Sequence, residues 1–385
     1  MLVPEPGKIS PPYAATFLLR SGRGRASLLL MAVVAGVAAW AWWVRTLPRP
    51  APAFASRSAV ARAADSRFRG VSWVAADSAA STDFSALVRN HVTWIAQTPF
   101  GWQTGTAEPS VQLHTERRPG RYGYWGESDY GLSQTAQQAR QLGIRTLLKP
   151  HLWIRGNGAW PGAVEMQSAA GWQAWFASYT AFIVHYAQLA ESEHLEALCI
   201  GTELEKTVGH EAEWRALIGR VRQVYHGPLT YAANWSGEFE QIRFWDALDF
   251  IGIQAYFPVS SKASPTKAEL LAGWQPHLRA IERVQRRFGK PVVFTEAGYK
   301  NTPDAAVEPW KWPDRTAAVP ATDEATQAAC YAALFETFWP RPWFKGLFVW
   351  KWYPGLAADG PARRHADFTP QHKPAEQVMA SWYGR

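Results

Sequence analysis

Apolar and polar positions alternate with two distinct periods over residues 67–385. Short apolar runs rich in β-branched and aromatic residues predict eight strands, at residues 69–74, 92–98, 144–152, 197–203, 229–234, 250–256, 291–296 and 346–351. Between most of them apolar residues recur at helical spacing, most clearly over residues 172–192, 211–225, 267–288 and 323–338. Strands that alternate with helices predict an α/β fold with a parallel sheet, and eight such units predict a closed (β/α)8 TIM barrel. No glycine-rich phosphate motif follows the first run, which argues against a dinucleotide-binding sheet.

The N-terminal region has a different pattern, because residues 26–44 form an uncharged apolar run. This run is just long enough for a helix to cross a bilayer, so it predicts a transmembrane or signal-anchor helix. Trp40, Trp42 and Trp43 lie at one end, where an interfacial aromatic belt is expected. A cleaved signal peptide, with a small-residue site at 53–55, is the alternative. We favour the anchor because the apolar core of a signal peptide has only about 7–15 residues.

Four segments follow from these patterns. They are a short basic segment (1–25), the predicted membrane helix (26–44), a flexible linker rich in Pro, Ala, Ser and Arg (45–66) and the barrel domain (67–385). Basic residues flank the apolar run on both sides, so the charge distribution alone does not set its orientation in the membrane.

The net charge of +8 is concentrated near the N-terminus. Residues 1–62 hold eight of the 40 basic residues and one of the 32 acidic residues, which leaves 32 basic and 31 acidic residues in the remainder. A nearly neutral domain lacks the basic surface that DNA or RNA requires, so a nucleic-acid partner is excluded. The two cysteines, Cys199 in a predicted strand and Cys330 in a predicted helix, do not form a disulfide framework, and we expect buried thiols.

Two glutamates carry the strongest chemical signal. Glu203 and Glu296 each close an apolar run that predicts a buried parallel strand. In a TIM barrel the carboxyl ends of the strands form one shared active-site mouth. Two carboxylates on different strands are what glycoside hydrolysis requires, although two unrelated surface acids remain the alternative. Glu205 competes with Glu203 because a period of two places both on the same strand face, but we expect it to begin the next loop.

Other polar and aromatic residues cluster at the same predicted strand ends. Lys149 and His151 are expected to contact sugar hydroxyls, and Trp350 to form a floor under the reacting sugar. The remaining candidates for substrate binding are Trp153, Asn234, Trp235, Tyr256 and Trp352. The 22 tryptophans support this, since an aromatic face can stack on a sugar ring. No metal or cofactor is expected, because His185, His194, His210 and His226 lack the spacing of metal ligands.

Four motifs occur in the order of a known enzyme family. They are Leu147-Leu148-Lys149-Pro150-His151, Gly201-Thr202-Glu203-Leu204, Phe294-Thr295-Glu296-Ala297-Gly298-Tyr299 and Asp367-Phe368-Thr369-Pro370-Gln371-His372-Lys373-Pro374-Ala375. From about residue 69 to near the C-terminus, the chain resembles glycoside hydrolase family 113, a family of clan A whose characterised members cleave β-1,4-mannan.

The resemblance implies a role for each glutamate. Retaining enzymes of clan A carry the acid/base on strand four and the nucleophile on strand seven, which correspond here to Glu203 and Glu296. It also implies that Tyr256 donates a hydrogen bond to Glu296. The chain departs from the clan at Thr202, where an asparagine that commonly contacts the sugar 2-hydroxyl usually precedes the acid/base.

The sequence therefore predicts a membrane-tethered retaining glycosidase that acts on a β-1,4-mannan-like polysaccharide. Two alternatives stay open: a glycosidase or transglycosylase for another β-linked exopolysaccharide, and a catalytically silent sugar-binding barrel in envelope or exopolysaccharide assembly. Because polysaccharide substrates lie outside the cytoplasm, we expect the barrel in the bacterial periplasm or at the cell surface. Cleavage of the N-terminal segment would instead give a secreted protein.

Overall fold

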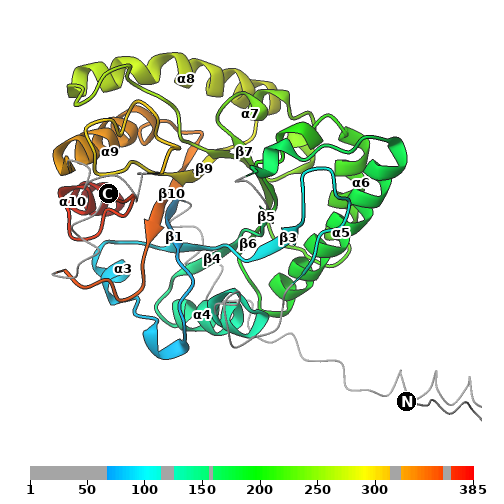
Figure 1. Ribbon diagram of the computed structural model, residues 1–385. Coiled ribbons are helices and arrows are strands. Elements are labelled where there is room, and N and C mark those ends of the chain that lie inside the picture. The colour runs from blue at the N-terminus through cyan, green and yellow to red at the C-terminus, as the bar shows by residue number, and fades with distance from the viewer. Residues whose placement is uncertain (1–66, 114–124, 156–158, 313–321, 359–365) are drawn as a thin grey trace, which may run out of the picture. The chain divides into compact units, whose positions relative to one another are not determined.

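The computed structural model describes residues 67–113, 125–155, 159–312, 322–358 and 366–385 (Figure 1). The predicted basic segment, membrane helix and linker lie outside these residues. Within the described ranges, no helix combines the length and apolarity needed to cross a membrane.

Eight parallel strands close into the predicted barrel, with each strand hydrogen-bonded to two neighbours. In order around the barrel they are β1 (Phe68–Trp73), β2 (Trp94–Gln97), β4 (Arg145–Leu148), β6 (Ala197–Thr202), β7 (Leu229–Asn234), β8 (Ile251–Gln254), β9 (Val292–Ala297) and β10 (Phe344–Trp352). The prediction of a (β/α)8 barrel is confirmed, and the strand ends move by only a few residues in most cases.

Helices surround the barrel (Figure 1). They are α3 (Ser85–Arg89), α4 (Asp129–Gln141), α5 (Ala169–Ser192), α6 (Glu211–Arg222), α7 (Glu238–Gln241), α8 (Lys267–Phe288), α9 (Glu324–Phe338) and α10 (Pro374–Tyr383). The four clearly predicted helices correspond to α5, α6, α8 and α9. The limits of α8 could be predicted from the sequence because both ends carry capping residues. Thr266 and Glu269 form a capping box at its start, and Gly289 ends the helix with a φ of 65°.

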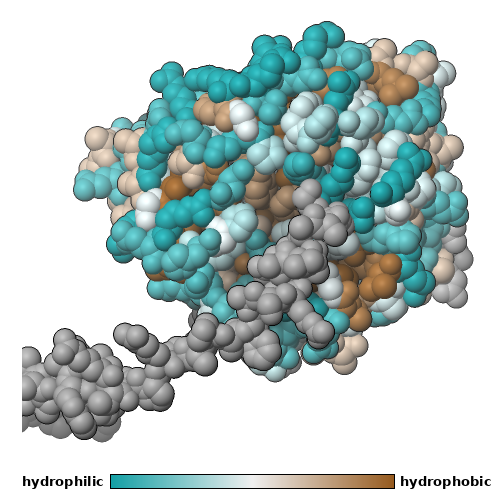
Figure 2. Space-filling view, turned by 180° about the vertical axis from the view of Figure 1, so that it is seen from behind, coloured by the Kyte–Doolittle hydropathy of each residue, from teal (hydrophilic) through white to brown (hydrophobic). Residues whose placement is uncertain are grey.

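The core has two layers. The larger one lies between the strands and the helices, and it includes the buried indoles of Trp175, Trp214 and Trp274. The smaller one fills the barrel interior with side chains of alternate strand residues, namely Trp94, Ala96, Leu147, Ala197, Cys199, Ala232, Phe250, Val293 and Phe348. Cys199 and Cys330 are buried free thiols, as expected. The face shown in Figure 2 is largely hydrophilic, with hydrophobic residues in separate groups.

The third predicted strand differs from the structure. Residues 144–152 were expected to form one strand, but the chain forms β4 and then β5 (His151–Ile154), which pairs with β3 (Phe100–Gln103) in a separate two-stranded sheet. The change occurs at Pro150, which has no N–H group for the barrel ladder. The amide of Lys149 still donates to Gln97 in β2, whereas the amide of His151 donates to Pro99. The barrel strand β4 therefore ends at Leu148, and Lys149 is the last residue that still bonds to β2.

Candidate active site

A pocket of about 580 Å³ opens at the carboxyl ends of the barrel strands and contains both candidate glutamates, Glu203 and Glu296. Its wall is largely aromatic, formed by Phe100, Trp153, Trp160, Trp235, Tyr256, Trp310, Trp312, Trp350 and Phe368. In the described part of the chain, the four strongly exposed tryptophans all belong to this wall. Such rings offer flat apolar surface to a ligand.

Glu203 follows β6 at a point where the backbone leaves regular strand geometry. The pairing of β6 with β7 shifts register between Cys199 and Thr202, so β6 carries an extra residue there. Glu203 has a left-handed backbone with a φ of 51°, while its amide still donates to Ala232 at 2.9 Å. Non-glycine residues rarely adopt this strained conformation. At this bend in the backbone, the side chain of Glu203 lines the pocket.

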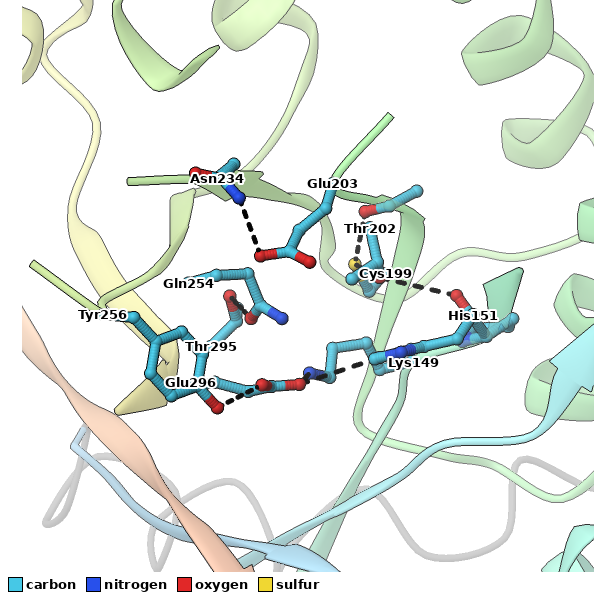
Figure 3. Close-up of polar contacts among 12 residues, drawn as sticks. Lys149, His151, Cys199, Thr202, Glu203, Asn234, Gln254, Tyr256, Thr295 and Glu296 are labelled. Carbon is cyan, nitrogen blue, oxygen red and sulfur yellow. Dashed lines mark hydrogen bonds and ion pairs between the residues drawn. The ribbon is translucent and has the colours of Figure 1, made fainter. Parts of the chain in front are cut away.

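The carboxyl group of Glu203 receives two hydrogen bonds. Nδ2 of Asn234 donates to Oε1 at 3.1 Å (Figure 3), and Nε1 of Trp160 donates to Oε2 at 3.2 Å. Burial and the nearby charge of Glu296 nevertheless raise the pKa of Glu203 to about 7, against the opposing effect of these donors. Glu203 can therefore both hold and release a proton near neutral pH.

Glu296 lies in β9, beside a register shift in the pairing of β8 with β9. Its Oε1 contacts the ammonium group of Lys149, and its Oε2 accepts a hydrogen bond from the Tyr256 hydroxyl at 2.6 Å (Figure 3). Burial alone would raise the pKa of Glu296, but the charge of Lys149 and the two hydrogen bonds hold that pKa below its ordinary value. Glu296 is therefore ionised at neutral pH.

His151 lies beside this pair without forming a hydrogen bond to it. Its Nε2 is 3.8 Å from Oε1 of Glu296, which exceeds hydrogen-bond length. Burial and the charge of Lys149 lower the pKa of His151 to about 3, although Glu296 opposes this. The imidazole is consequently neutral, and Lys149 supplies the positive charge next to Glu296.

The orientation of Asn234 is fixed by its own neighbours. Its Oδ1 accepts a hydrogen bond from the amide of Ser236 at 2.8 Å, which leaves Nδ2 for Glu203. Its backbone amide donates to Oε2 of Glu238 at 2.5 Å. The side chain that contacts Glu203 is thus held at both ends.

Glu238 links Asn234 to the segment that follows Glu203. It is fully buried, and its Oε1 contacts the Tyr231 hydroxyl, which accepts a hydrogen bond from the Leu204 amide at 2.8 Å. Burial raises the pKa of Glu238 to about 8. Glu238 does not line the pocket. Its carboxyl group nevertheless connects Asn234, which donates to Glu203, with Leu204, which follows Glu203 in the chain.

The structure brings most of the predicted site residues together. Eight of the ten line the pocket, namely His151, Trp153, Glu203, Asn234, Trp235, Tyr256, Glu296 and Trp350. The expected hydrogen bond from Tyr256 to Glu296 is present. Glu205 begins the short turn Glu205–Thr207, as expected, and is not among the pocket residues.

Two predictions are corrected. Lys149 was expected to contact sugar hydroxyls, but it is fully buried and contacts Glu296 instead. Trp352 was expected to line a subsite, but it is only 2% exposed and belongs to the core between strands and helices. The cause is a register shift in which Val71 pairs with Val349 but Trp73 pairs with Trp352. The extra residue in β10 reverses the alternation of faces.

Several pocket residues were not predicted. Trp160, Trp310 and Trp312 come from loops, where no periodicity indicates which way a side chain points. Trp310 stacks on Trp235 with ring centroids 4.8 Å apart, so these two rings form one continuous surface. Gln254 ends β8 inside the pocket, and its position two residues before Tyr256 in the predicted strand 250–256 could have indicated it.

Histidines do not build a metal centre in the described ranges, where no cluster of three or more potential ligands occurs. His185 lies on α5 and pairs with Asp129 on α4 at 3.0 Å, away from the pocket.

Comparisons with known proteins agree with the geometry. The sequence profile of Glycoside Hydrolase Family 113 matches residues 68–373. A solved β-1,4-mannanase of this family, in a complex, is 26% identical with a TM-score of 0.69, covering 83% of this chain and 99% of its own. The β-mannanase AaManA from Alicyclobacillus acidocaldarius, in complex with ManMIm, is 28% identical with a TM-score of 0.70, covering 83% and 97%.

A more distant likeness concerns the fold alone. A β-glucuronidase from Ruminococcus gnavus is 14% identical with a TM-score of 0.51, and the match covers 79% of this chain and 46% of the glucuronidase. No curated protein matches the chain. The profile match spans most of the barrel domain, and the pocket holds the two carboxylates of the family resemblance. The chain therefore belongs to glycoside hydrolase family 113 and is a glycoside hydrolase.

Proposed function

We propose that this protein is a retaining glycosidase that cleaves a β-1,4-mannan-like polysaccharide, with Glu296 as nucleophile and Glu203 as acid/base. One observation carries the assignment: the two carboxyl groups of the pocket have opposite protonation preferences. The surroundings of Glu296 favour its ionised form, whereas burial and the charge of Glu296 favour the protonated form of Glu203. A nucleophile and a proton donor need these two states before the reaction begins.

In the first step, a carboxylate oxygen of Glu296 attacks the anomeric carbon of the bound sugar. The glycosidic bond breaks, and Glu203 transfers its proton to the leaving oxygen. The product is an ester between Glu296 and the sugar, and Glu203 is left ionised. The hydrogen bonds from Asn234 and Trp160 stabilise that charge on Glu203.

In the second step, the ionised Glu203 removes a proton from a water molecule. The oxygen of that water bonds to the anomeric carbon while the ester bond to Glu296 breaks. Lys149 and Tyr256 contact the carboxylate that is released, so they stabilise the departing charge. Both glutamates return to their starting protonation states.

The solved relatives support the substrate class. Two solved structures, matched to this chain over nearly all of their own length, are named as β-mannanases of the same family. The stacked pair Trp235 and Trp310 gives the pocket a wide apolar surface beside the catalytic glutamates, which suits successive rings of a polysaccharide.

Variants of the two glutamates test the roles. Glu296→Ala should abolish hydrolysis of aryl β-mannosides and manno-oligosaccharides. Glu203→Ala should retain formation of the glycosyl-enzyme with an activated aryl leaving group, and added azide should accelerate its turnover, because azide needs no general base. Glu205→Ala, on the adjacent turn, is the matched control. Near wild-type hydrolysis by both pocket variants would refute the assignment.

Proton NMR of the first product tests stereochemistry. We expect the β-anomer to form before mutarotation, because two displacements retain configuration. A panel of manno-, gluco-, xylo- and glucosamine oligosaccharides tests the substrate, with the highest kcat/KM expected for the manno series. An initial α-anomer, or preference for another series, would contradict the mechanism or the substrate respectively.

We further propose that residues 26–44 anchor the protein in a membrane with the barrel outside the cytoplasm. The uncharged apolar run supports this. The full chain should sediment with membranes and its barrel should be digested by external protease in spheroplasts, whereas a chain lacking residues 1–44 should stay in the cytoplasm. Protection of the full-length protein from external protease would contradict the orientation.

A further inference from the structure

We propose that Gln254 is a further substrate-contacting residue, whose side-chain amide donates a hydrogen bond to the 2-hydroxyl of the sugar between the two glutamates. This inference rests on the proposed function and deepens it, because it assigns a residue to one group of the sugar. It follows from the strand register, the orientation of the amide and the lack of a hydrogen-bond partner for its nitrogen among the described residues.

The strand register places Gln254 centrally. In the barrel it pairs with Asn234 of β7 on one side and with Glu296 of β9 on the other. Asn234 in turn donates to Glu203. Gln254 thus belongs to a row of residues across three strands that begins beside the acid/base and ends at the nucleophile.

The orientation of the Gln254 amide is fixed by Thr295. The Thr295 hydroxyl donates to Oε1 of Gln254 at 3.0 Å, so the amide nitrogen lies at the opposite end of the group. Figure 3 shows this nitrogen directed away from Thr295, into the space between Glu203 and Glu296. The register shift beside Gln254 gives β9 an extra residue, which allows both Thr295 and Glu296 to act on the pocket side of β9.

The N–H groups of the Gln254 amide are available to a ligand. Gln254 is only 1% exposed, yet no hydrogen bond from its Nε2 to any described residue is formed, and the side chain lines the pocket. Buried polar groups are normally hydrogen-bonded, and leaving one without a partner is costly. A donor held in this way is suited to a ligand hydroxyl.

Chemistry selects the 2-hydroxyl. The two glutamates flank the anomeric carbon, whose ring neighbours are the ring oxygen and the carbon that carries the 2-hydroxyl. A donor to the ring oxygen would oppose the positive charge that develops there, whereas hydrogen bonds to the 2-hydroxyl strengthen in the transition state. The Gln254 amide therefore lowers the barrier rather than only binding the ground state.

Gln254→Met tests the contact because it keeps the length of the side chain without the donor. We expect kcat to fall roughly 10- to 100-fold on an aryl β-mannoside with little change in KM, as for a lost buried hydrogen bond. Gln275→Met, which changes an exposed glutamine of α8, is the matched control and should leave both constants unchanged. Circular dichroism and thermal melts establish that each variant is folded.

A 2-deoxy substrate separates a contact from a packing effect. Wild type and Gln254→Met are each assayed on the aryl β-mannoside and on its 2-deoxy analogue. The ratio of wild-type to variant kcat/KM should be large for the first substrate and close to one for the second. Each ratio compares two enzymes on one substrate, so the intrinsic reactivity of the substrate cancels. When the ratio for the mannoside is divided by the ratio for the 2-deoxy analogue, the folded fraction of each enzyme cancels as well.

Variants of Thr295 test the orientation of the amide. Thr295→Val removes the hydroxyl that holds Oε1 of Gln254, whereas Thr295→Ser keeps it. We expect the valine variant to be the slower of the two on the mannoside, and this difference should vanish in a Gln254→Met background, because the two residues act through one contact.

The outcomes separate this inference from the proposed function. An active wild type with equal ratios on both substrates overturns the role of Gln254 and leaves the glycosidase assignment intact. A wild type that hydrolyses neither mannoside nor oligosaccharide overturns both. A ratio near one only for the 2-deoxy substrate supports the contact.

Discussion

Lys149 and Glu296 form an ion pair that is shielded from solvent, with the side chain of Lys149 fully buried and that of Glu296 only 5% exposed. Such a pair loses the hydration of both charges, and each charge then depends on the other. Lys149 directly follows β4, and its backbone amide still donates to Gln97 of β2 at 2.8 Å, so its position is held by the backbone. The pair therefore favours the ionised form of Glu296, the proposed nucleophile.

Removing Lys149 should raise the pKa of Glu296. In Lys149→Met the burial of Glu296 is no longer opposed by the ammonium group, so its carboxylate becomes protonated at a higher pH. The acidic limb of the kcat/KM profile should move to higher pH. The free energy of unfolding at pH 7 should fall by about 3 kcal/mol, as when a buried pair loses one partner.

Lys206→Met is the matched control, because Lys206 pairs with Glu165 in a half-exposed position. An exposed pair contributes about 0.5 kcal/mol, and neither residue of this pair lines the pocket. An unshifted acidic limb in Lys149→Met would show that the ion pair does not set the ionisation of Glu296.

Trp160→Phe should raise the pKa of Glu203. The indole donates to the carboxyl group and favours its ionised form, so its loss favours the protonated acid. Since Glu203 is the proposed proton donor, the alkaline limb of kcat/KM should lie near pH 7 in the wild type and at higher pH in the variant. Trp382→Phe on α10 is the control, and a shift to lower pH in Trp160→Phe would contradict the assignment.

Glu203→Gln should stabilise the fold above neutral pH while abolishing catalysis. The folded state raises the pKa of Glu203 from 4.5 to about 7, so between these values it binds more protons than the unfolded state. Wild-type stability therefore falls as the pH rises through that window, by up to about 3 kcal/mol. Urea unfolding at pH 4 and pH 8 measures this.

The gain from Glu203→Gln should be near zero at pH 4 and largest at pH 8. Glu205→Gln, two residues further on, controls for the loss of one carboxylate from the same loop. Equal stabilisation at both pH values would mean that Glu203 is not a buried charge in the folded protein.

Two tryptophans should respond oppositely to truncation. Trp352→Ala should lower the free energy of unfolding by about 3–5 kcal/mol, since the indole is buried in the core. Trp310→Ala removes an exposed ring that stacks on Trp235, so it should leave stability near wild type and raise KM for oligosaccharides by about 2- to 10-fold. Denaturant titration and steady-state kinetics measure both, and the reverse pattern would contradict the placement of these rings.

The number and order of the eight barrel strands could be predicted because each apolar run is flanked by polar segments or turns, whereas the separate sheet of β3 and β5 was not predicted. The local irregularities could not. Trp350 and Trp352 have the same parity in sequence, yet the extra residue in β10 places one in the pocket and the other in the core. A bulge depends on the register with a neighbouring strand, which one sequence does not contain.

Part of the chemistry of the site could also be predicted from the apolar runs. Glu203 and Glu296 stood out as acids that end apolar runs, and the direction of the Glu203 pKa shift follows from burial and proximity. Lys149 was assigned to the sugar hydroxyls because it lies with His151 at the end of the third predicted strand. Its contact with Glu296 and the entry of the loop residues Trp160 and Trp310 into the pocket depend on tertiary folding, which local sequence patterns do not show.

The left-handed backbone of Glu203 affects how this enzyme can be engineered for heat resistance. Its conformation is one that glycine adopts without strain, and its carboxyl group is costly to bury. A library screened only for survival at high temperature would therefore enrich replacements such as Glu203→Gly, which relieve both penalties and remove the proposed proton donor. Thermal selection on this scaffold should be coupled to a turnover assay, because a replacement that relieves strain at Glu203 would also remove the carboxyl group on which the proposed mechanism depends.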